Sequence, residues 1–358
     1  MDPILNNNLN PIIQNHTKKP WHKRPLFYFL VTAILIGCYY GYQFSLAYNT
    51  ISVDNSSWWD GVANIFDKRQ DESKPDPYPM PEKESDRLDI LILGLRGEDN
   101  AAIEGEGGLL TDTMIIASID EVTKKTALVS IPRDLYVDIE IKTPASKNIR
   151  IKGKINSVYE RGLEGSNGIA IAKEVLSRLT GVYIDKAVVF DFDAFNEIVN
   201  NIGGIDIRLA KPFEEKNQWG YEFSLPAGDN HLQGDQALYY VRSRYSTSDF
   251  DRARRQQEVI AAIKTKALSL GFLSNPNKVT GLLSDLKNHI RTDFQLWDIK
   301  DMVTLASGFG GKTGTKNYVI TTDNLVYETK TEKGEYILLP KEGNYDAIQK
   351  LLSEILIN

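Results

Sequence analysis

Apolar residues along the 358-residue chain fall into runs whose spacing indicates local structure. Short continuous apolar runs are typical of buried strands, and they predict strands at residues 88–95, 113–119, 126–131, 187–192, 205–209 and 336–339. Apolar residues at helical spacing predict helices at residues 169–179, 194–202, 251–270, 296–305 and 344–357. Because strands alternate with helices, we expect an α/β fold built as a three-layer α/β/α sandwich.

The longest apolar run lies near the N-terminus. Residues 26–46 contain no charged side chain, and about 21 helical residues span roughly the 30 Å of a bilayer's hydrocarbon core. Basic residues precede the run, so the sequence predicts a cytoplasmic tail at residues 1–25, a single transmembrane helix at residues 26–46 and an extracytoplasmic remainder. A cleaved signal peptide is the less favoured alternative, because the run is long and lacks a clear small-residue cleavage site.

A charged, proline-rich segment follows this run. Residues 67–87 have no hydrophobic periodicity, which is typical of an extended linker. Together with the residues before it, this segment forms an expected extracytoplasmic linker over residues 47–87. Neither an internal repeat nor a second linker follows, so we expect residues 88–358 to fold as one domain.

Composition makes several functions improbable. A formal net charge of −6 gives no general affinity for nucleic acid. The single cysteine, Cys38, rules out an internal disulfide, and the four histidines lack zinc-ligand spacing. Residues 306–313 resemble a phosphate-binding loop, but Ala306 replaces its first glycine and no predicted strand precedes it. We therefore expect neither a zinc site nor a nucleotide site.

Positive charge is nevertheless concentrated in residues 231–258, which contain five arginines: Arg242, Arg244, Arg252, Arg254 and Arg255. From residue 249 onward the segment has the pattern of a helix. Helical phase places Arg252 and Gln256 on its apolar stripe, so both should point inward. Arg254 should face solvent, and Arg255 should lie between the two faces. If residues 241–245 are extended, Arg242 and Arg244 project from one face.

Inward-facing arginines require anions, because burying an unpaired guanidinium costs several kcal/mol. The anions can be carboxylates of this chain or phosphates of a ligand, which arginine binds bidentately. The charge pattern alone favours neither ligand binding nor a purely structural role.

Three further segments place charged residues at the ends of apolar runs. Asp112 precedes the predicted strand at residues 113–119, and Arg133 and Asp134 follow the one at residues 126–131. Lys154 opens a predicted helix. Ligands of open α/β sheets bind at the carboxyl edge of the strands. Each segment alone is more typical of a helix cap or a salt bridge.

Together, these motifs resemble the LytR-CpsA-Psr family over nearly all of residues 88–358. The resemblance rests on DTM (112–114), SIPRD (130–134), KIN (154–156), the glycine pair (203–204) after FDAF, and YVRSR (240–244) followed by DxxRxxRQQ (249–257). It implies a magnesium-dependent phosphotransferase at the outer face of the cytoplasmic membrane. Such an enzyme moves a glycopolymer from a polyprenyl (undecaprenyl) diphosphate carrier to a cell-wall acceptor such as peptidoglycan, and releases polyprenyl phosphate.

The resemblance also implies roles for individual residues. Asp112 would bind Mg²⁺, and Asp134 and Asp249 would orient the arginines or assist catalysis, with the general base left open. The diphosphate would be held by Arg133, Lys154, Arg242, Arg244, Arg252, Arg255 and Gln256. Phosphoryl transfer depends mainly on charge stabilisation and positioning, which suits such a set.

The sequence departs from the family pattern at two places. Family members commonly carry a second acidic magnesium ligand after the first strand, where this chain has Leu95, Arg96 and Gly97; the nearby candidates are Glu98, Asp99, Glu104 and Glu106. Val137 replaces a basic residue found in some members. Two alternatives therefore stand beside the transferase: a non-catalytic polyprenyl-phosphate-binding regulatory module, and a polyprenyl diphosphate pyrophosphatase that uses water.

Overall fold

The computed structural model describes residues 77–95, 109–142, 148–164, 167–216, 218–271, 282, 285–286, 288–295, 298 and 315–357. All of them belong to the second of two units into which the chain divides, Met1–Leu46 and Ala47–Asn358. The predicted transmembrane helix at 26–46 lies outside the described residues, as does most of the predicted helix at 296–305. Within the described residues, no helix combines the length and apolar character needed to cross a bilayer.

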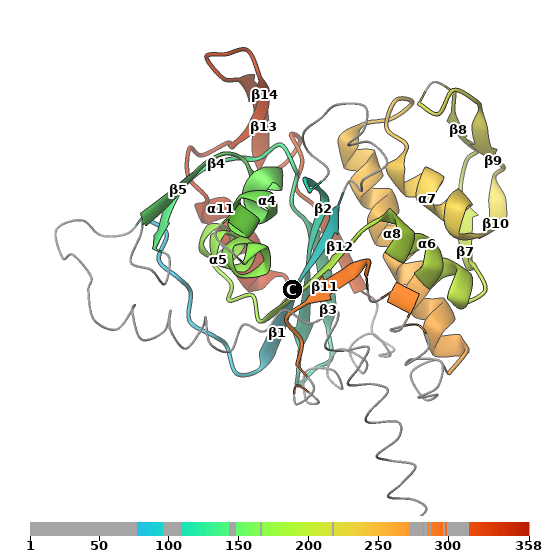
Figure 1. The fold of residues 1–358 in the computed structure, drawn as a ribbon, viewed down its shortest axis with the longest axis horizontal. Helices are drawn as coiled ribbons and strands as arrows, with labels where there is room; N and C mark the ends of the chain where they lie inside the picture. Colours follow the sequence, from blue (N-terminus) through green and yellow to red (C-terminus); the bar gives the residue numbers. More distant parts are fainter. Residues whose placement is uncertain are drawn as a thin grey trace, which may run out of the picture. The chain divides into compact units, whose positions relative to one another are not determined.

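A six-stranded mixed sheet forms the middle layer (Figure 1). Its strands in spatial order are β11 (Ile290–Thr292), β6 (Lys186–Phe190), β1 (Arg87–Leu95), β2 (Thr111–Asp120), β3 (Thr126–Ser130) and β12 (Thr315–Val319). The β1–β6 and β3–β12 pairs are parallel, and the other neighbours are antiparallel. The predicted strands that correspond to β1, β2, β3 and β6 are confirmed with small shifts at their ends.

Helices cover both faces of this sheet (Figure 1). One face carries α4 (Val158–Glu164), α5 (Gly168–Thr180) and α11 (Asp346–Glu354), and the other carries α6 (Phe192–Asn201), α7 (Gly234–Arg242) and α8 (Asp249–Ser269). The predicted three-layer sandwich is therefore confirmed. The condition that residues 241–245 are extended is not met, because α7 continues through Arg242.

Strand β1 is apolar at most positions, with Arg87 and Asp89 as the charged exceptions, because it is covered on both faces. Leu91 and Leu93 join the core beneath α5 and α11, whereas Leu88 and Ile90 join a second core on the opposite face. Neighbouring side chains of a strand alternate between faces, so a strand covered on both sides needs apolar residues at nearly every position. The central sheet is thus fixed by two separate apolar layers.

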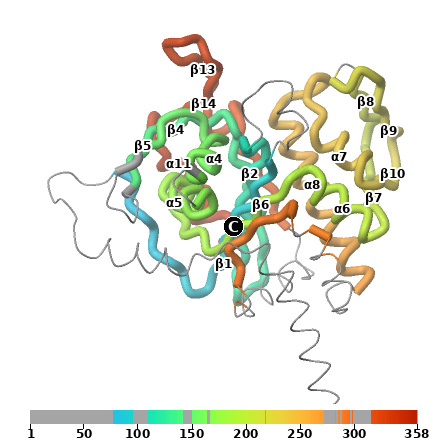
Figure 2. The backbone as a smooth tube through the Cα atoms, in the orientation of Figure 1, coloured from blue at the N-terminus to red at the C-terminus, as the bar shows by residue number. Residues whose placement is uncertain are grey.

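A third core holds together the part of the chain that includes α6, α7 and α8. Two small two-stranded antiparallel sheets join these helices: β7 (Ile205–Leu209) with β10 (Gly228–Leu232), and β8 (Phe213–Glu215) with β9 (Phe223–Leu225). Figure 2 shows these elements gathered on one side of the sheet. The predicted strand at residues 205–209 is confirmed as β7, but β8, β9 and β10 were not predicted because such short strands carry little periodicity.

Two further hairpins lie beyond the central sheet: β4 (Tyr136–Lys142) with β5 (Asn148–Lys154), and β13 (Val326–Lys330) with β14 (Tyr336–Pro340). A short 3₁₀ helix, η3 (Ile155–Ser157), follows β5. The predicted strand at residues 336–339 is confirmed as β14. Both hairpins attach close to the loop that contains Arg133 and Asp134, so they border the charged residues described next.

Candidate functional site

The structure gathers five charged residues from four separate segments. Asp112 is the second residue of β2, and Lys154 is the last residue of β5. Arg133 and Asp134 lie in the loop between β3 and β4, and Asp249 is the first residue of α8. Ion pairs connect all of these residues, which are far apart in the sequence. The structure therefore confirms that these motifs come together in space.

Arg133 lies at the centre of this ion-pair network. Its Nη1 donates to Oδ1 of Asp112 at 2.7 Å, and its Nε lies 3.6 Å from a carboxylate oxygen of Asp134 and 3.7 Å from one of Asp249. Burial opposes the charge of Arg133, but Asp112 and Asp249 outweigh it and raise the pKa of the guanidinium. Arg133 therefore remains fully charged.

Arg252 extends the network from α8. The residue is only 5% exposed, which confirms the predicted inward orientation. Its Nη2 lies 2.9 Å from Oδ1 of Asp249 and donates to the Asp112 carbonyl at 3.1 Å. Burial lowers the pKa of Arg252, and repulsion from Arg133 and Arg244 adds to this effect despite the nearby Asp249. An added anion would therefore stabilise the charged form of Arg252.

Two buried nitrogen atoms of the network lack hydrogen-bond acceptors within the described part of the chain, and one of them belongs to Arg252, which lines the cavity described next. The Nε atoms of Arg133 and Arg252 are both buried, and neither makes a hydrogen bond with a described residue. A buried donor without an acceptor costs about 1 to 3 kcal/mol. Phosphate oxygens of a ligand would remove this cost. Lys154 is already engaged, because its Nζ lies 2.6 Å from Oδ1 of Asp134.

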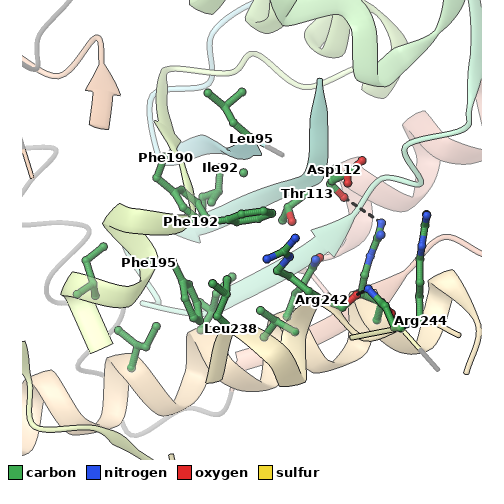
Figure 3. A pocket seen from close by; sticks show the side chains of 18 of the residues that line it. Ile92, Leu95, Asp112, Thr113, Phe190, Phe192, Phe195, Leu238, Arg242 and Arg244 are labelled. Carbon is green, nitrogen blue, oxygen red and sulfur yellow. Dashed lines mark hydrogen bonds between the residues drawn. The ribbon is translucent and has the colours of Figure 1, made fainter. Parts of the chain in front are cut away.

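A cavity of about 340 Å³ opens beside the network. Its apolar part is lined by residues of the sheet, α6, α7 and α8: Ile92, Phe190, Phe195, Leu238, Ile260 and Ile263. Its polar part is lined by Asp112, Arg242, Arg244, Arg252 and Gln256. Figure 3 shows Asp112 and Arg244 at one end, Phe195 and Leu238 at the other, and Arg242 between them. The space therefore suits a molecule with an anionic head and an apolar tail.

Aromatic rings hold the guanidinium of Arg242 at the cavity. Its central carbon lies 3.9 Å from the ring centroid of Phe192 and 4.9 Å from that of Trp219. Arg244 has no carboxylate within 4.0 Å among the described residues, and its guanidinium lies 5.7 Å from the ring of Tyr245. Stacking on an aromatic ring fixes the orientation of a guanidinium.

Glu215, the last residue of β8, and Gln218, which lies between β8 and β9, fix the backbone around these two arginines. The side-chain amide of Gln218 makes two hydrogen bonds to the backbone. Its Nε2 donates to the Arg242 carbonyl at 3.1 Å, and its Oε1 accepts from the backbone N–H of Arg244 at 2.7 Å. The buried Glu215 carboxylate accepts from the Tyr245 amide at 3.0 Å. The sequence analysis missed Glu215 and Gln218, because the backbone groups that they contact lie about 25 or more residues further along the chain.

Arg255 is placed differently from the expectation that it binds the diphosphate. Its Nε donates to the Tyr240 carbonyl at 2.9 Å, its Nη1 donates to the Thr247 hydroxyl at 3.1 Å, and its Nη2 donates to the Ser243 carbonyl. It is buried and does not line the cavity. These contacts favour a role in holding the α7–α8 connection, and a direct contact between Arg255 and a ligand stays an untested prediction.

The neighbouring arginine and glutamines of α8 divide between solvent, the cavity and the core. Arg254 is exposed, as predicted, and pairs with Asp251 at 2.5 Å. Gln256 lines the cavity, which confirms its predicted inward orientation. Gln257, which was not singled out from the sequence, donates to the Ser130 hydroxyl at 2.8 Å and to the Tyr318 carbonyl at 2.9 Å. It therefore anchors α8 to β3 and β12.

The carboxylate of Asp112 fits the ligand chemistry of Mg²⁺. It is a partly exposed oxygen donor at the polar end of the cavity, beside the arginines. Mg²⁺ in protein sites is usually held by one or two carboxylates together with substrate phosphates and water. The predicted candidates for a second acidic ligand, Glu98, Asp99, Glu104 and Glu106, lie outside the described residues.

A second group of possible metal ligands has a simpler explanation. Asp191, Asp193 and His289 have ligand atoms within 4.8 Å of one another. Asp191 accepts from the Ala194 amide at 2.9 Å and so caps α6, and it lies 2.8 Å from Nδ1 of His289. The hydrogen bond to Asp191 raises the pKa of His289. A helix cap and an ion pair account for this cluster.

Comparisons with known proteins agree with this geometry. The model of the LytR_cpsA_psr family matches residues 59–354. The polyisoprenyl-teichoic acid–peptidoglycan teichoic acid transferase TagU of Enterococcus faecalis is 32% identical over 260 residues, which cover 71% of this chain and 77% of TagU. The corresponding transferase TagV of Bacillus subtilis is 28% identical over 269 residues, which cover 74% of this chain and 63% of TagV.

A solved structure also has the same fold. The protein gbs0355 from Streptococcus agalactiae superposes with a TM-score of 0.60 at 22% identity, covering 76% of this chain and 89% of that protein. At this identity the likeness supports the fold alone.

Proposed function

Because the chain belongs to the LytR-CpsA-Psr family, we propose that it is a glycopolymer phosphotransferase. The proposed donor is a glycopolymer linked to a polyprenyl diphosphate, and the acceptor is a cell-wall glycan such as peptidoglycan. The relatives TagU and TagV bear the names of teichoic acid–peptidoglycan transferases, which supports both partners.

The observation that carries this proposal is the shape of the cavity. It combines apolar walls from Phe190, Phe195 and Ile263 with a cationic end formed by Arg242, Arg244 and Arg252. A polyprenyl diphosphate has the same division, because an apolar chain is joined directly to two phosphates. The buried Nε of Arg252, which has no hydrogen-bond partner among the described residues, provides a donor for a phosphate oxygen.

In the proposed reaction, a hydroxyl oxygen of the acceptor attacks the phosphorus that carries the glycopolymer. A new P–O bond forms, the bond from this phosphorus to the bridging oxygen breaks, and polyprenyl phosphate leaves with that oxygen. The hydroxyl proton passes to the carboxylate of Asp134 or Asp249, the two acids that flank Arg133. Negative charge builds on the phosphate oxygens, where Arg133 and Arg252 stabilise it.

We assign Mg²⁺ to Asp112 in this proposal. When bound, the ion would neutralise charge on the diphosphate and help to orient it. Arg133 holds the Asp112 carboxylate at 2.7 Å and so fixes its position. Lys154 holds Asp134 in the same way at 2.6 Å.

We also propose that the protein acts at the outer face of the cytoplasmic membrane. The uncharged residues 26–46, preceded by basic residues, support a single-pass anchor with the N-terminus inside. This position would give the cavity access to a lipid-linked donor and to the cell wall.

A paired substitution on α8 tests the proposed function. Arg252→Ala should lower release of polyprenyl phosphate from a lipid-diphosphate-linked donor by a factor of roughly 10³, the lower end for an arginine that stabilises phosphoryl transfer. Arg254→Ala is the matched control, because Arg254 is exposed on the same helix and should leave the rate unchanged. Arg133→Ala should also lower the release of polyprenyl phosphate, and circular dichroism should show that both variants remain folded.

The same assay separates the alternatives. The full-length protein in detergent, with donor and Mg²⁺, should release polyprenyl phosphate only when a peptidoglycan fragment is added. Equal release without acceptor would identify a pyrophosphatase, and binding without release would identify a regulatory module. Retained transfer in Arg252→Ala would exclude the proposed role of this residue.

A further inference from the structure

The β13–β14 hairpin is attached directly to the charged network. The amide of Leu338 donates to the Asp134 carbonyl at 2.9 Å, and Leu338 also forms a bridge with Leu135. From this attachment the hairpin projects beyond the edge of the sheet (Figure 1). Asp134 therefore lies at the base of the hairpin, next to β14.

The two faces of the hairpin carry different tyrosines. Tyr336 pairs with Lys330 and Leu338 pairs with Glu328, so Tyr336 and Glu328 lie on one face. Tyr327 pairs with Leu339 and lies on the opposite face. The two rings are similarly accessible, because Tyr336 is 41% exposed and Tyr327 is 43% exposed. Position, and not exposure, distinguishes them.

Tyr336 is the tyrosine on the same face of β14 as Leu338, the residue that bonds Asp134, and it lies two residues from Leu338. Its pKa is raised first by burial and then by the carboxylates of Glu328, Asp134 and Asp249. Two of these acids, Asp134 and Asp249, flank Arg133. The register of β14 and the bond from Leu338 to Asp134 thus place Tyr336 at the end of the hairpin that borders the proposed proton acceptors.

The direction of approach follows from the cavity. The lipid chain would lie in the apolar part of the cavity, against α6, α7 and α8. An acceptor hydroxyl must reach the phosphorus from another side, and the carboxylates of Asp134 and Asp249 mark that side. A sugar ring presents an apolar C–H face and polar hydroxyl edges, which match an exposed aromatic ring with carboxylates beside it.

We propose that Tyr336, with Glu328 beside it, forms the acceptor subsite, in which a sugar ring of the cell-wall glycan stacks on the tyrosine while its hydroxyl reaches the diphosphate. This assignment rests on the proposed phosphotransferase function. It gives the β13–β14 hairpin the role of acceptor platform and separates the acceptor side from the lipid side.

Steady-state kinetics of the full-length protein test the subsite. The acceptor is a tetrasaccharide of alternating N-acetylglucosamine and N-acetylmuramic acid, and the readout is released polyprenyl phosphate. Tyr336→Ala should raise the acceptor KM on the order of tenfold, the loss expected for one aromatic contact, and leave the donor KM unchanged. Tyr336→Phe should stay within about twofold of the natural protein, because the ring is retained.

The matched control is Tyr327→Ala, which removes an equally exposed ring from the other face of the same hairpin. It should leave both KM values unchanged. An unchanged acceptor KM in Tyr336→Ala, or an equal rise in both alanine variants, would overturn the subsite.

A binding measurement separates this inference from the proposed function. Saturation-transfer NMR with the same tetrasaccharide should show contact in the natural protein and in Tyr327→Ala, and a loss of contact in Tyr336→Ala. If this pattern appears without any transfer, the subsite stands and the proposed function fails. If the natural protein transfers the polymer but Tyr336→Ala still contacts the tetrasaccharide equally, the function stands and the subsite fails.

Discussion

Asp89 is a carboxylate inside the central sheet, and its neighbours decide when it is charged. Nε of Arg87 lies 2.6 Å from its Oδ2, and the Ser118 hydroxyl donates to its Oδ1. Burial raises the pKa of Asp89 to about 6, because the stabilising contacts with Arg87 and Ser118 only partly offset the loss of hydration. The folded protein therefore holds this proton more tightly than the unfolded chain, in which an aspartate has a pKa of about 3.9.

This difference predicts a pH-dependent stability. A raised folded-state pKa stabilises the fold fully below about pH 4, and the contribution is lost as the pH rises through about 6. The free energy of unfolding of the natural protein, relative to Asp89→Asn, should therefore fall between about pH 4 and pH 7. Urea denaturation of both proteins across this range measures it.

Asp138 supplies the control for this experiment. A hydrogen bond from Arg150 lowers the pKa of this exposed carboxyl, so its proton linkage has the opposite sign and lies below about pH 4. Asp138→Asn should show no pH-dependent difference from the natural protein across the same range. A constant offset between the natural protein and Asp89→Asn would contradict the raised pKa of Asp89.

Arg252 and Arg255 lie three residues apart on α8 and have different roles. Arg252 faces the cavity, and Arg255 binds backbone carbonyls of the α7–α8 connection. Both are buried. Arg255 has acceptors from the chain at all three guanidinium nitrogens, whereas the Nε of Arg252 has none among the described residues. Burial alone therefore does not distinguish a ligand-binding arginine from a structural one.

At the scale of elements, α8 must be held at a fixed height above the sheet. Gln257 performs this task through its amide, which donates to Ser130 of β3 and to the Tyr318 carbonyl of β12. Gln257→Leu would leave these buried acceptors without a donor and should lower the free energy of unfolding by about 1 to 3 kcal/mol. Thermal or urea denaturation measures the loss.

The neighbouring glutamine provides the contrast. Gln256 lines the cavity and is only partly buried, so Gln256→Leu should leave the unfolding free energy nearly unchanged while it lowers the transfer rate. If both leucine variants lose stability equally, the assignment of Gln257 as the anchor is wrong.

The β8–β9 connection is a second element with a positioning role. Gln218 fixes the backbone on both sides of Ser243 and so sets where Arg242 and Arg244 point. Gln218→Ala should slow transfer on the order of tenfold and raise the donor KM, because two hydrogen bonds of about 1 kcal/mol each are lost. The acceptor KM should not change.

Glu214 is the control for Gln218, since it lies on the same hairpin but is exposed and pairs only with Lys216 among the described residues. Glu214→Ala should retain the donor KM of the natural protein. A fall in melting temperature in Gln218→Ala that accounts for the whole loss of rate would argue against a positioning role.

At the scale of the whole molecule, the cavity lies between the central sheet and the layer formed by α6, α7 and α8. If the apolar end of the cavity holds the polyprenyl chain, a bulky side chain placed there should weaken the binding of long-chain donors more than that of short-chain donors. Ile263→Trp places a large ring there and should weaken a donor with a long polyprenyl chain much more than one with a short chain. Donor KM values for the two chain lengths give the comparison.

Thr265→Trp is the matched control, because Thr265 lies two residues further along α8 and is exposed. It should not change the ratio of the two KM values. Equal weakening of short and long donors by Ile263→Trp would show that the chain binds elsewhere.

The sequence by itself determined the strands β1, β2, β3, β6, β7 and β14, the helices α5, α6, α8 and α11, the inward phase of Arg252 and Gln256, and the charged motifs at the ends of apolar runs. These features depend on local periodicity and on residues next to one another in the chain, which a single sequence displays. The family resemblance of the motifs also grouped Asp112, Arg133 and Asp249 in one site, and ion pairs join them in the structure.

Only the tertiary structure decided which apolar residues line a cavity and which fill a core. Phe195 and Leu238 have the same hydrophobic character as Val199, yet they border open space and Val199 does not. A cavity arises where elements distant in sequence fail to close upon one another, so no local pattern records it. The same reason hid Gln218 and the place of Tyr336, since their partners lie in other segments of the chain.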